Sequence, residues 1–382
     1  MNNKKFRILY VINADWYFNL HWLERALHLL ASGNDVHLAV PVVDENIKER
    51  LVAAGIKVHN YRMKRTSIGI LQELKALLAL NTIIKQVKPD IVHSVTIKPN
   101  LYASVLGFAH GFKFVSTYAG LGTLISSNTV KHNVARKVVF GCIKFFSRKT
   151  TNIALFENED DKLFFEENNI LNKNKLIRVY GAGVDCNKYN YTPPSGECTR
   201  LKVLFASRLL KNKGLDEVVA AVKALMSNGY KIELAVAGII DTDSPFAYSK
   251  SQIEAFKNEP AVNWLGERSD IEALIKTADV IALPTSYGEG VPRILIEACS
   301  IGRPIITTSL GGCKDICLHN VNGFIVKPNN PDDVKQALLA LIQDPSLIAS
   351  MGAKGRLLVE ERFSNEQIFL SHNSVYQQLI NQ

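Results

Sequence analysis

Two successive runs of alternating β-rich and helical segments constrain the fold of this chain more than any other feature of its sequence. The first run opens with the β-rich segment 6–12, and a helical pattern over 20–31 follows and ends at Gly33. Further strands are expected at 36–40, 57–59, 89–94, 113–117 and 152–156, with helices at 45–54, 69–87, 101–109 and 131–147 between them. Because such alternation is typical of βαβ units, it predicts a parallel sheet covered by helices on both faces.

The alternation restarts after the polar segment 191–197, which is rich in Pro and Gly. Strands are expected at 201–206, 231–237, 261–265, 280–283, 304–307 and 323–326, and helices at 215–227, 271–277, 293–301, 331–343, 345–360 and 365–380. We therefore expect an α/β protein of two doubly wound, Rossmann-like domains, 1–190 and 199–364, with the helix 365–382 packing back on the first. Such sheets bind ligands at the carboxyl ends of their strands, which predicts a site in the cleft between the sheets.

The net charge of +9 is unevenly distributed along the chain. Residues 1–185 hold 25 Lys and Arg against 15 Asp and Glu, whereas the remainder holds 20 against 21. Nucleic acid, an anionic membrane surface or an anionic substrate would each explain this excess, and so would a merely basic solvated surface. The segment 130–149 is basic and amphipathic, so it suits either contact with an anionic membrane or packing on the sheet with a basic outer face.

Several familiar sequence patterns do not occur in the chain. The six cysteines are scattered, and none lies in a Cys-x-x-Cys pair, so we expect no zinc site. Their even number is compatible with disulfides, but a chain with large cores does not need them, so we expect reduced thiols. The charged N-terminus leads directly into a strand, which is unlike a secretory signal, and no run approaches the ~18 apolar residues of a spanning helix. No Gly-x-Gly-x-x-Gly follows a strand, which disfavours a dehydrogenase. We expect a cytoplasmic protein that needs neither a metal nor a cofactor.

The segment 284–298 carries the clearest chemical signal. An apolar strand ends there in a Gly-rich turn, and a helix begins near Pro292, a residue suited to the first helical position. The free N–H groups and the positive dipole end of that helix make an anion site. Glu289 in the turn and Glu297 in the helix can bracket a ligand, one at a sugar hydroxyl and the other at a ribose diol. The alternative is that both are solvated carboxylates near a helix end.

A second charged segment, 207–214, also lies between a predicted strand and a helix. Arg208 supplies a planar fork for phosphate oxygens, and Lys213 supplies a point charge. Cations at one strand end and a helix N-terminus at another suit a diphosphate. The alternative is a pair of ordinary surface cations.

Together these residues resemble the family 4 retaining glycosyltransferases, which have the GT-B fold. Glu289 and Glu297 match the E-x7-E arrangement of that family, and Arg208 and Lys213 match its R-x4-K pair. The segment 181–185 looks like the family's N-G-V-D turn at the hinge between its domains. Gly311-Gly312, Asn322-Gly323 and Asp332-Asp333 also fit its C-terminal domain. The resemblance is strong over 201–361 and looser before it.

The segments 93–100 and 120–122 are similar to parts of bacterial transferases that extend polyprenyl-diphosphate-linked sugars at the cytoplasmic membrane face. This closer resemblance implies a nucleotide-sugar donor, namely a UDP-sugar, and a lipid-linked saccharide acceptor for O-antigen, capsule or N-glycan precursors. It also implies peripheral contact with the anionic inner membrane and no nucleic-acid partner.

The resemblance assigns a role to each matching residue. Arg208 and Lys213 would hold the donor diphosphate and stabilise the leaving group, Glu297 would bind the ribose hydroxyls, and Glu289 would contact the donor sugar. Transfer would retain the anomeric configuration, and no metal is expected because the two cations neutralise the diphosphate. The implied catalytic residues are Arg208, Lys213 and Glu289, and the donor-binding set adds Arg268, Gly290, Val291, Pro292 and Glu297.

The acceptor side departs from the family pattern. The segment 13–18 has no Gly-rich loop, and 116–120 has no His after its strand. Candidates for acceptor contacts are Asp15, His21, His93 and Lys98, although a His at a strand end, such as His93, is often a hydrogen-bonded structural residue. Two other functions are considered: a sugar-nucleotide epimerase of the same fold, which lacks the combined R-x4-K and E-x7-E pattern, and a non-catalytic basic protein that binds lipid or nucleic acid, which leaves that pattern unexplained.

Overall fold

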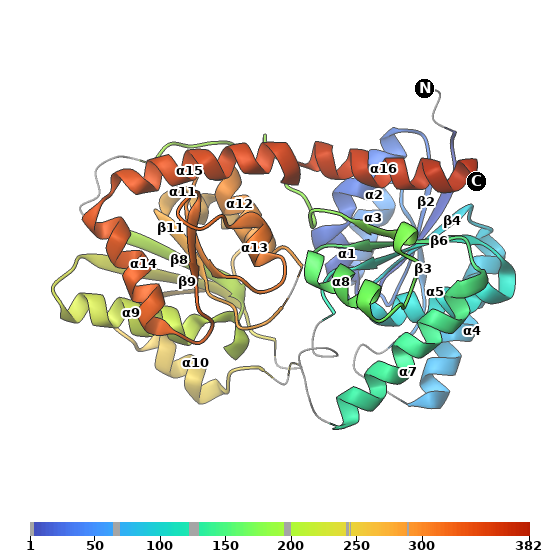
Figure 1. Cartoon of the computed structure of the whole chain (residues 1–382), viewed down its shortest axis with the longest axis horizontal. Helices are drawn as coiled ribbons and strands as arrows, with labels where there is room; N and C mark the ends of the chain where they lie inside the picture. Colours follow the sequence, from blue (N-terminus) through green and yellow to red (C-terminus); the bar gives the residue numbers. More distant parts are fainter. Residues whose placement is uncertain are drawn as a thin grey trace. The chain divides into compact units, whose positions relative to one another are not determined.

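The computed structural model of the chain divides into two compact units (Figure 1). Unit 1 comprises Met1–Ala182 and Asn365–Gln382, and unit 2 comprises Gly183–Ser364. Each unit is built on a parallel sheet, which confirms the predicted α/β class with two Rossmann-like domains. The structure describes residues 4–63, 69–121, 130–194, 200–241, 244, 246–288 and 290–382.

Unit 1 contains a seven-stranded sheet of order β3-β2-β1-β4-β5-β6-β7, in which every neighbouring pair is parallel. Its strands are β1 (Arg7–Val11), β2 (Asp35–Val40), β3 (Lys57–Asn60), β4 (Ile91–Val95), β5 (Lys113–Tyr118), β6 (Asn152–Phe156) and β7 (Leu176–Arg178). The central strands are buried almost throughout, as expected for a parallel sheet that is covered on both faces. The strand order reverses between β1 and β4, which makes that point the ligand-binding edge typical of such sheets.

Helices cover both faces of this sheet: α1 (Asp15–His21), α2 (Leu23–Ala31), α3 (Glu45–Ala53), α4 (Ile70–Val87), α5 (Ile97–His110), α7 (Val130–Phe146), α8 (Glu159–Glu167) and α16 (Asn365–Asn381). Successive side chains of a strand point to opposite faces. Ile8 and Tyr10 therefore share a core with α1, α2 and α16, whereas Leu9 and Val11 share one with α4 and α5. A third cluster joins α7 and α8 to β5 and β6.

Helix α16 comes from the far end of the sequence and completes the first of these cores. Its side chains Val375, Tyr376 and Leu379 are buried against the sheet. The Tyr376 hydroxyl lies 3.3 Å from the hydroxyl of Tyr10 and 2.6 Å from Nδ1 of His93. Residues far apart in the chain thus form one continuous core.

Unit 2 contains a six-stranded parallel sheet of order β10-β9-β8-β11-β12-β13. Its strands are β8 (Leu201–Arg208), β9 (Ile232–Ile239), β10 (Val262–Gly266), β11 (Val280–Leu283), β12 (Ile305–Thr308) and β13 (Gly323–Val326). The helices are α9 (Leu215–Ser227), α10 (Lys250–Lys257), α11 (Ile271–Thr277), α12 (Arg293–Ile301), α13 (Cys313–Ile316), α14 (Pro331–Gln343) and α15 (Ser346–Leu358). A five-residue π-helix over Val359–Phe363 follows α15. The strand order reverses between β8 and β11, so the loops after these two strands share the ligand-binding edge.

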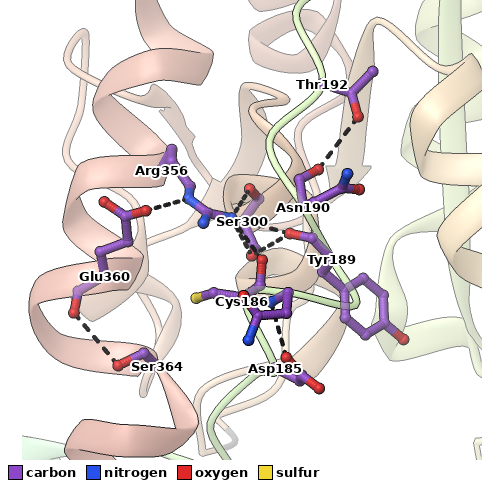
Figure 2. Close-up of polar contacts among 10 residues, drawn as sticks. Asp185, Cys186, Tyr189, Asn190, Thr192, Ser300, Arg356, Glu360 and Ser364 are labelled. Atoms are coloured by element: carbon purple, nitrogen blue, oxygen red, sulfur yellow. Dashed lines mark hydrogen bonds and ion pairs between the residues drawn. The ribbon is translucent and has the colours of Figure 1, made fainter.

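The chain enters unit 2 at Gly183, before the Pro- and Gly-rich segment that marks the boundary in the sequence. The residues that follow pack on α12 and α15, where Arg356 Nη1 donates to the carbonyl oxygens of Cys186 at 3.3 Å and Tyr189 at 3.1 Å (Figure 2). Contacts with distant helices, rather than local composition, therefore set this boundary. Within the described parts of the chain, we find no helix with the length and apolar character that a membrane span requires.

Candidate active site

The loops after β8 and β11 are joined at the point where the strand order of unit 2 reverses. The carbonyl oxygen of Asn212 accepts hydrogen bonds from the Ser286 amide at 3.0 Å and from Thr285 Oγ1 at 2.9 Å. Gly214 permits this approach, because its φ is +87° and a Cβ there would lie 2.5 Å from the Pro284 carbonyl oxygen. Both segments that the sequence analysis singles out therefore belong to one local structure.

Arg208 and Lys213 belong to the first of these loops. Arg208 ends β8, and its Nη1 lies 2.9 Å from Oδ2 of Asp241, which follows β9. Lys213 is only 5% exposed, and its Nζ lies 5.9 Å from the ring centroid of Tyr287. Burying an ammonium group costs free energy unless other groups replace the water it loses. An aromatic face replaces part of that lost stabilisation. Lys213 thus lies beside the loop after β11, whereas Arg208 pairs with the segment after β9.

Glu297 lies inside α12 and pairs with a neighbouring guanidinium group. It is 6% exposed, and its Oε1 lies 2.6 Å from Nε of Arg293, one turn earlier in the helix. The buried Tyr189 phenol lies near this pair, and burial, together with the charge of Glu297, raises its pKa well above its usual value. Arg293 is therefore a neighbour of Glu297 that the E-x7-E pattern does not single out.

The loop between β11 and α12 supplies backbone groups at the start of the helix. Pro292 is the N-cap residue rather than the first helical residue, so the predicted position of this proline is wrong by one place. Gly312 packs against the loop so closely that a Cβ there would lie 2.5 Å from the Val291 amide nitrogen and 2.6 Å from the Gly290 carbonyl carbon. The glycine after β12 therefore supports the backbone of Gly290 and Val291. Glu289 lies outside the described residues.

Arg268 follows β10 at the same edge of the sheet, but β9 separates that strand from β8. Its guanidinium forms a two-point pair with Asp270, with Nε to Oδ1 at 2.8 Å and Nη2 to Oδ2 at 2.5 Å. Both side chains are more than 40% exposed. Exposed pairs of this kind contribute little to stability, so Arg268 can exchange Asp270 for another anion at small cost.

Three of the acceptor candidates lie near the carboxyl ends of β1 and β4 in unit 1. Asp15 is buried, and its Oδ2 accepts from the amides of Val43 at 2.6 Å and Asp44 at 2.8 Å, which ties the loop after β2 to α1. Lys98 Nζ pairs with Glu73 at 2.8 Å. His21 ends α1 and packs on another aromatic ring of that helix. The position of Asp15 indicates a loop-holding role, whereas Lys98 and His21 stay partly exposed.

His93, the fourth candidate, is fully buried in β4. Its Nδ1 lies 2.6 Å from the Tyr376 hydroxyl, and its Nε2 lies 2.7 Å from Thr117 Oγ1. Burial lowers the pKa of this imidazole well below its usual value, so the ring stays neutral. The geometry favours the structural alternative, in which His93 fixes α16 to the sheet.

A buried polar cluster near these candidates has no signal in the sequence. The guanidinium of Arg25 lies 4.2 Å from the ring centroid of Trp22, and its Nη2 donates to the carbonyl oxygen of Gly181 at 2.8 Å. Glu157 directly follows β6, where burial raises its pKa to about 7 against the opposing effect of Arg25. Burial likewise raises the pKa of Asp161 to about 6. Among the described residues, no group of three or more His, Cys, Asp or Glu side chains is arranged to hold a metal ion.

Family models match both halves of the chain. The model described as Glycosyl transferase 4-like matches residues 7–158, and the model described as Glycosyl transferases group 1 matches residues 195–358. The second match contains both charged segments of unit 2.

Three curated relatives match most of the chain. The capsular polysaccharide biosynthesis glycosyltransferase CapM of Staphylococcus aureus is 25% identical over 373 residues, which cover 90% of this chain and 89% of CapM. The N,N'-diacetylbacillosaminyl-diphospho-undecaprenol alpha-1,3-N-acetylgalactosaminyltransferase of Campylobacter jejuni is 26% identical, covering 86% of this chain and 88% of its own. The UDP-Gal:alpha-D-GlcNAc-diphosphoundecaprenol alpha-1,3-galactosyltransferase of Escherichia coli is 25% identical, covering 76% of each chain.

Solved structures share the fold along the entire chain. A glycosyltransferase from Rickettsia africae superposes with a TM-score of 0.75 at 21% identity, covering 99% of both chains. Anabaena HepE in complex with UDP-glucose superposes with a TM-score of 0.78 at 17% identity, covering 98% of this chain and 100% of its own.

Proposed function

Because the chain belongs to the glycosyltransferases and has the GT-B fold, we propose that it transfers a sugar from a UDP-sugar to a lipid-linked saccharide. Two of the curated relatives are named for acceptors that carry a diphosphoundecaprenol group, which supports this acceptor class. CapM is named for capsular polysaccharide biosynthesis, and we accordingly assign the product to a bacterial surface polysaccharide or glycan.

The main support for this proposal is the place where the loops after β8 and β11 are hydrogen-bonded to each other. Arg208 ends β8 and Lys213 lies in the loop after it, and the loop after β11 that this loop meets leads into α12, so two cations and a positive helix end would hold one diphosphate. In the proposed reaction they bind the donor diphosphate and stabilise the charge that develops as the nucleotide leaves. Glu297 takes the ribose diol, Glu289 contacts the donor sugar, and the anomeric configuration is retained.

Calorimetry with UDP, GDP and several UDP-sugars tests this site directly. We expect the wild-type protein to bind UDP and the Arg208→Ala/Lys213→Ala variant to lose about 100-fold or more in affinity, since each charge-assisted bond contributes roughly 1.5–3 kcal/mol. The control is Arg200→Ala/Lys223→Ala, which removes two exposed cations that form surface pairs in the same unit.

Equal affinity in the two double variants, or no nucleotide binding by the folded wild type, would overturn the proposal. A bound UDP-sugar whose sugar is epimerised without transfer to any acceptor would favour the epimerase instead. Transfer to polyprenyl-diphosphate saccharides would establish the acceptor class.

We also propose that unit 1 contacts an anionic membrane through α4, α5 and α7. On α7, Val134, Val138 and Phe145 are each more than half exposed, although their spacing places them on one side of the helix. The segment 130–149 contains six basic residues and no acidic residue. An apolar stripe with basic flanks is the pattern of helices that lie at a membrane surface.

Helix α4 extends this surface. Leu71, Leu74 and Leu78 are exposed at helical spacing, and α4 shares a core with α5. Phe108 of α5 is partly exposed, and its ring centroid lies 6.0 Å from that of Phe145 in α7. In Figure 1, α4, α5 and α7 lie close together in unit 1. We call the seven exposed apolar side chains Leu71, Leu74, Leu78, Phe108, Val134, Val138 and Phe145 the membrane face.

Vesicle sedimentation tests the membrane face. We expect binding to vesicles that contain phosphatidylglycerol, weak binding to phosphatidylcholine alone, and weakening of the former by salt. Val134→Ser/Val138→Ser/Phe145→Ser should reduce binding about tenfold or more, because each buried apolar side chain contributes roughly 1.5–3 kcal/mol. The control Leu357→Ser/Leu370→Ser changes exposed leucines outside the face. Equal loss in both variants, or no vesicle binding by the wild type, would contradict the membrane contact.

A further inference from the structure

The hydroxyl group of Thr285 connects the two loops that meet at the carboxyl edge of the unit 2 sheet. Thr285 follows Pro284 after β11, and its side chain is completely buried. Its Oγ1 donates to the carbonyl oxygen of Asn212 at 2.9 Å and accepts from the amide of Tyr287 at 3.3 Å. A hydroxyl can donate and accept at the same time, so this one group links the loop after β8 to the backbone of Tyr287.

The neighbouring strand β12 holds Thr285 in place. Thr308, the last residue of β12, is buried, and its Oγ1 donates to the Thr285 carbonyl oxygen at 2.7 Å. The Thr285 amide donates to the carbonyl oxygen of Leu283 at 2.8 Å. The amide, the carbonyl and the hydroxyl of Thr285 thus all have partners, and a buried polar network that is fully hydrogen-bonded is rigid.

Lys213 lies between two residues that are fixed against the loop after β11. Asn212, the residue before it, is bound through its carbonyl oxygen to the Thr285 hydroxyl. Gly214, the residue after it, packs against Pro284 so closely that a Cβ would lie 2.5 Å from the carbonyl oxygen. The backbone position of Lys213 is therefore set by the loop after β11.

The same hydroxyl fixes both sides of a cation–π contact. Lys213 Nζ lies 5.9 Å from the ring centroid of Tyr287, a range in which an aromatic face attracts an ammonium group. Thr285 holds the backbone on each side of this contact, through Asn212 and through Tyr287 itself. Because Lys213 is almost completely buried, neighbouring atoms restrict its side chain, and the ammonium group follows the position of the backbone.

We propose that Thr285 is a positioning residue for the donor diphosphate, because its hydroxyl holds the Lys213 ammonium group where the diphosphate binds. This inference rests on the proposed function, in which Lys213 binds that diphosphate. A cation that is already held in place loses less conformational freedom when its ligand arrives, so binding is tighter. Thr285 acts in this way through Lys213, without a contact of its own to the donor.

The test compares UDP with uridine, which lacks the diphosphate. We define the diphosphate preference as the affinity for UDP divided by the affinity for uridine, the latter measured by displacement calorimetry. Thr285→Val removes the hydroxyl and nearly keeps the shape of the side chain. We expect it to reduce the diphosphate preference about tenfold, the equivalent of one buried hydrogen bond. Thr285→Ser, which restores a hydroxyl, should recover most of the preference.

Structural damage alone would weaken the binding of both ligands equally and leave the diphosphate preference unchanged. Such a result for Thr285→Val would overturn the proposal. No recovery in Thr285→Ser would also overturn it, because the hydroxyl would then not be the group that matters.

Two further variants separate the inference from its premise. Lys213→Ala should lower the diphosphate preference, and the addition of Thr285→Val should then have no further effect. If Lys213→Ala keeps the preference, the assigned role of Lys213 fails. If Lys213→Ala lowers the preference but Thr285→Val keeps it, or if the two losses add in the double variant, the role of Thr285 alone is overturned.

The matched control is Thr150→Val in unit 1, which also removes a buried hydroxyl that donates to a backbone carbonyl, that of Ser147 at 3.1 Å. It should leave the diphosphate preference unchanged. Thr308→Val removes the hydrogen bond to the Thr285 carbonyl and should give a smaller loss of the same preference. This milder variant decides the question if Thr285→Val proves unstable, since an unchanged preference in Thr308→Val would count against the proposal.

Discussion

Glu157 lies at the carboxyl end of the unit 1 sheet. Of the described carboxyl groups there, it is the one whose ionised form the fold destabilises most clearly. Burial raises its pKa from 4.5 to about 7, against the favourable charge of Arg25. Between these two values the folded protein binds a proton that the unfolded chain releases. The stability that comes from this proton is complete below about pH 4.5 and is lost as the pH rises through 7.

The Glu157→Gln substitution should therefore stabilise unit 1 more at pH 8 than at pH 4.5. We expect the difference in free energy of unfolding between variant and wild type to grow by about 3 kcal/mol over this range, at ~1.4 kcal/mol per pKa unit. Urea unfolding at both pH values measures it. His372, whose pKa burial lowers to about 3, shifts stability in the opposite direction but equally in both proteins. A difference independent of pH would show that Glu157 is ionised in the fold throughout.

At the scale of elements, the contact between the loops after β8 and β11 depends on one glycine. Gly214→Ala forces a side chain into a positive φ and into the Pro284 carbonyl, 2.5 Å away. Gly229→Ala is the matched control, since Gly229 has a φ of +84° and no atom within 4 Å of the added Cβ.

Both variants should lose about 1–2 kcal/mol through backbone strain. Gly214→Ala should lose roughly 1–3 kcal/mol more through overpacking, together with affinity for UDP. Chemical unfolding and calorimetry measure the two effects. Equal losses of stability in the two variants would show that the loops separate without cost.

The strands and most helices could be predicted from the alternation of apolar segments, and the exceptions have local causes. The start of α5 at Ile97 rather than 101 follows an unusual backbone at Thr96, whose φ of 73° and ψ of 164° are rare outside glycine. The three-residue edge strand β7 is too short to show a period. Helix α10 has no clear apolar period in the sequence, although a capping box of Ser249 and Gln252 marks its start.

Some residues of the candidate site could likewise be predicted from the sequence, and others could not. Arg208, Lys213 and Glu297 could be identified because each lies within a short pattern beside a strand or a helix start. Tyr189 could not, because it comes near Glu297 only after the fold brings distant segments together, and no local rule carries that information. His93 lies near the carboxyl end of a strand, where sheets of this kind bind ligands. Its complete burial, which only the structure reveals, indicates a structural role instead.

At the scale of the whole molecule, the last helix stabilises the first unit. Leu379 of α16 is 0% exposed within the unit 1 core, whereas Leu370 of the same helix is 59% exposed. Leu379→Ala should cost about 2–5 kcal/mol through the cavity it leaves, and Leu370→Ala should change stability by less than ~0.5 kcal/mol. Fluorescence of Trp22, whose ring centroid lies 5.8 Å from that of His372 in α16, reports the unfolding of this unit. Equal midpoints for the two variants would mean that α16 contributes little to the core.

The same helix sets the order in which the chain can fold as it is made. Unit 2 is continuous, from Gly183 to Ser364, but the core of unit 1 needs residues 365–382. Ribosomes add roughly 5–20 residues per second, so about 10–40 s separate the synthesis of Ala182 from that of the final helix. During this interval the nascent first unit exposes the apolar surface that α16 later covers, and the second unit can fold before it. A chaperone that shields this surface would therefore raise the yield of native protein.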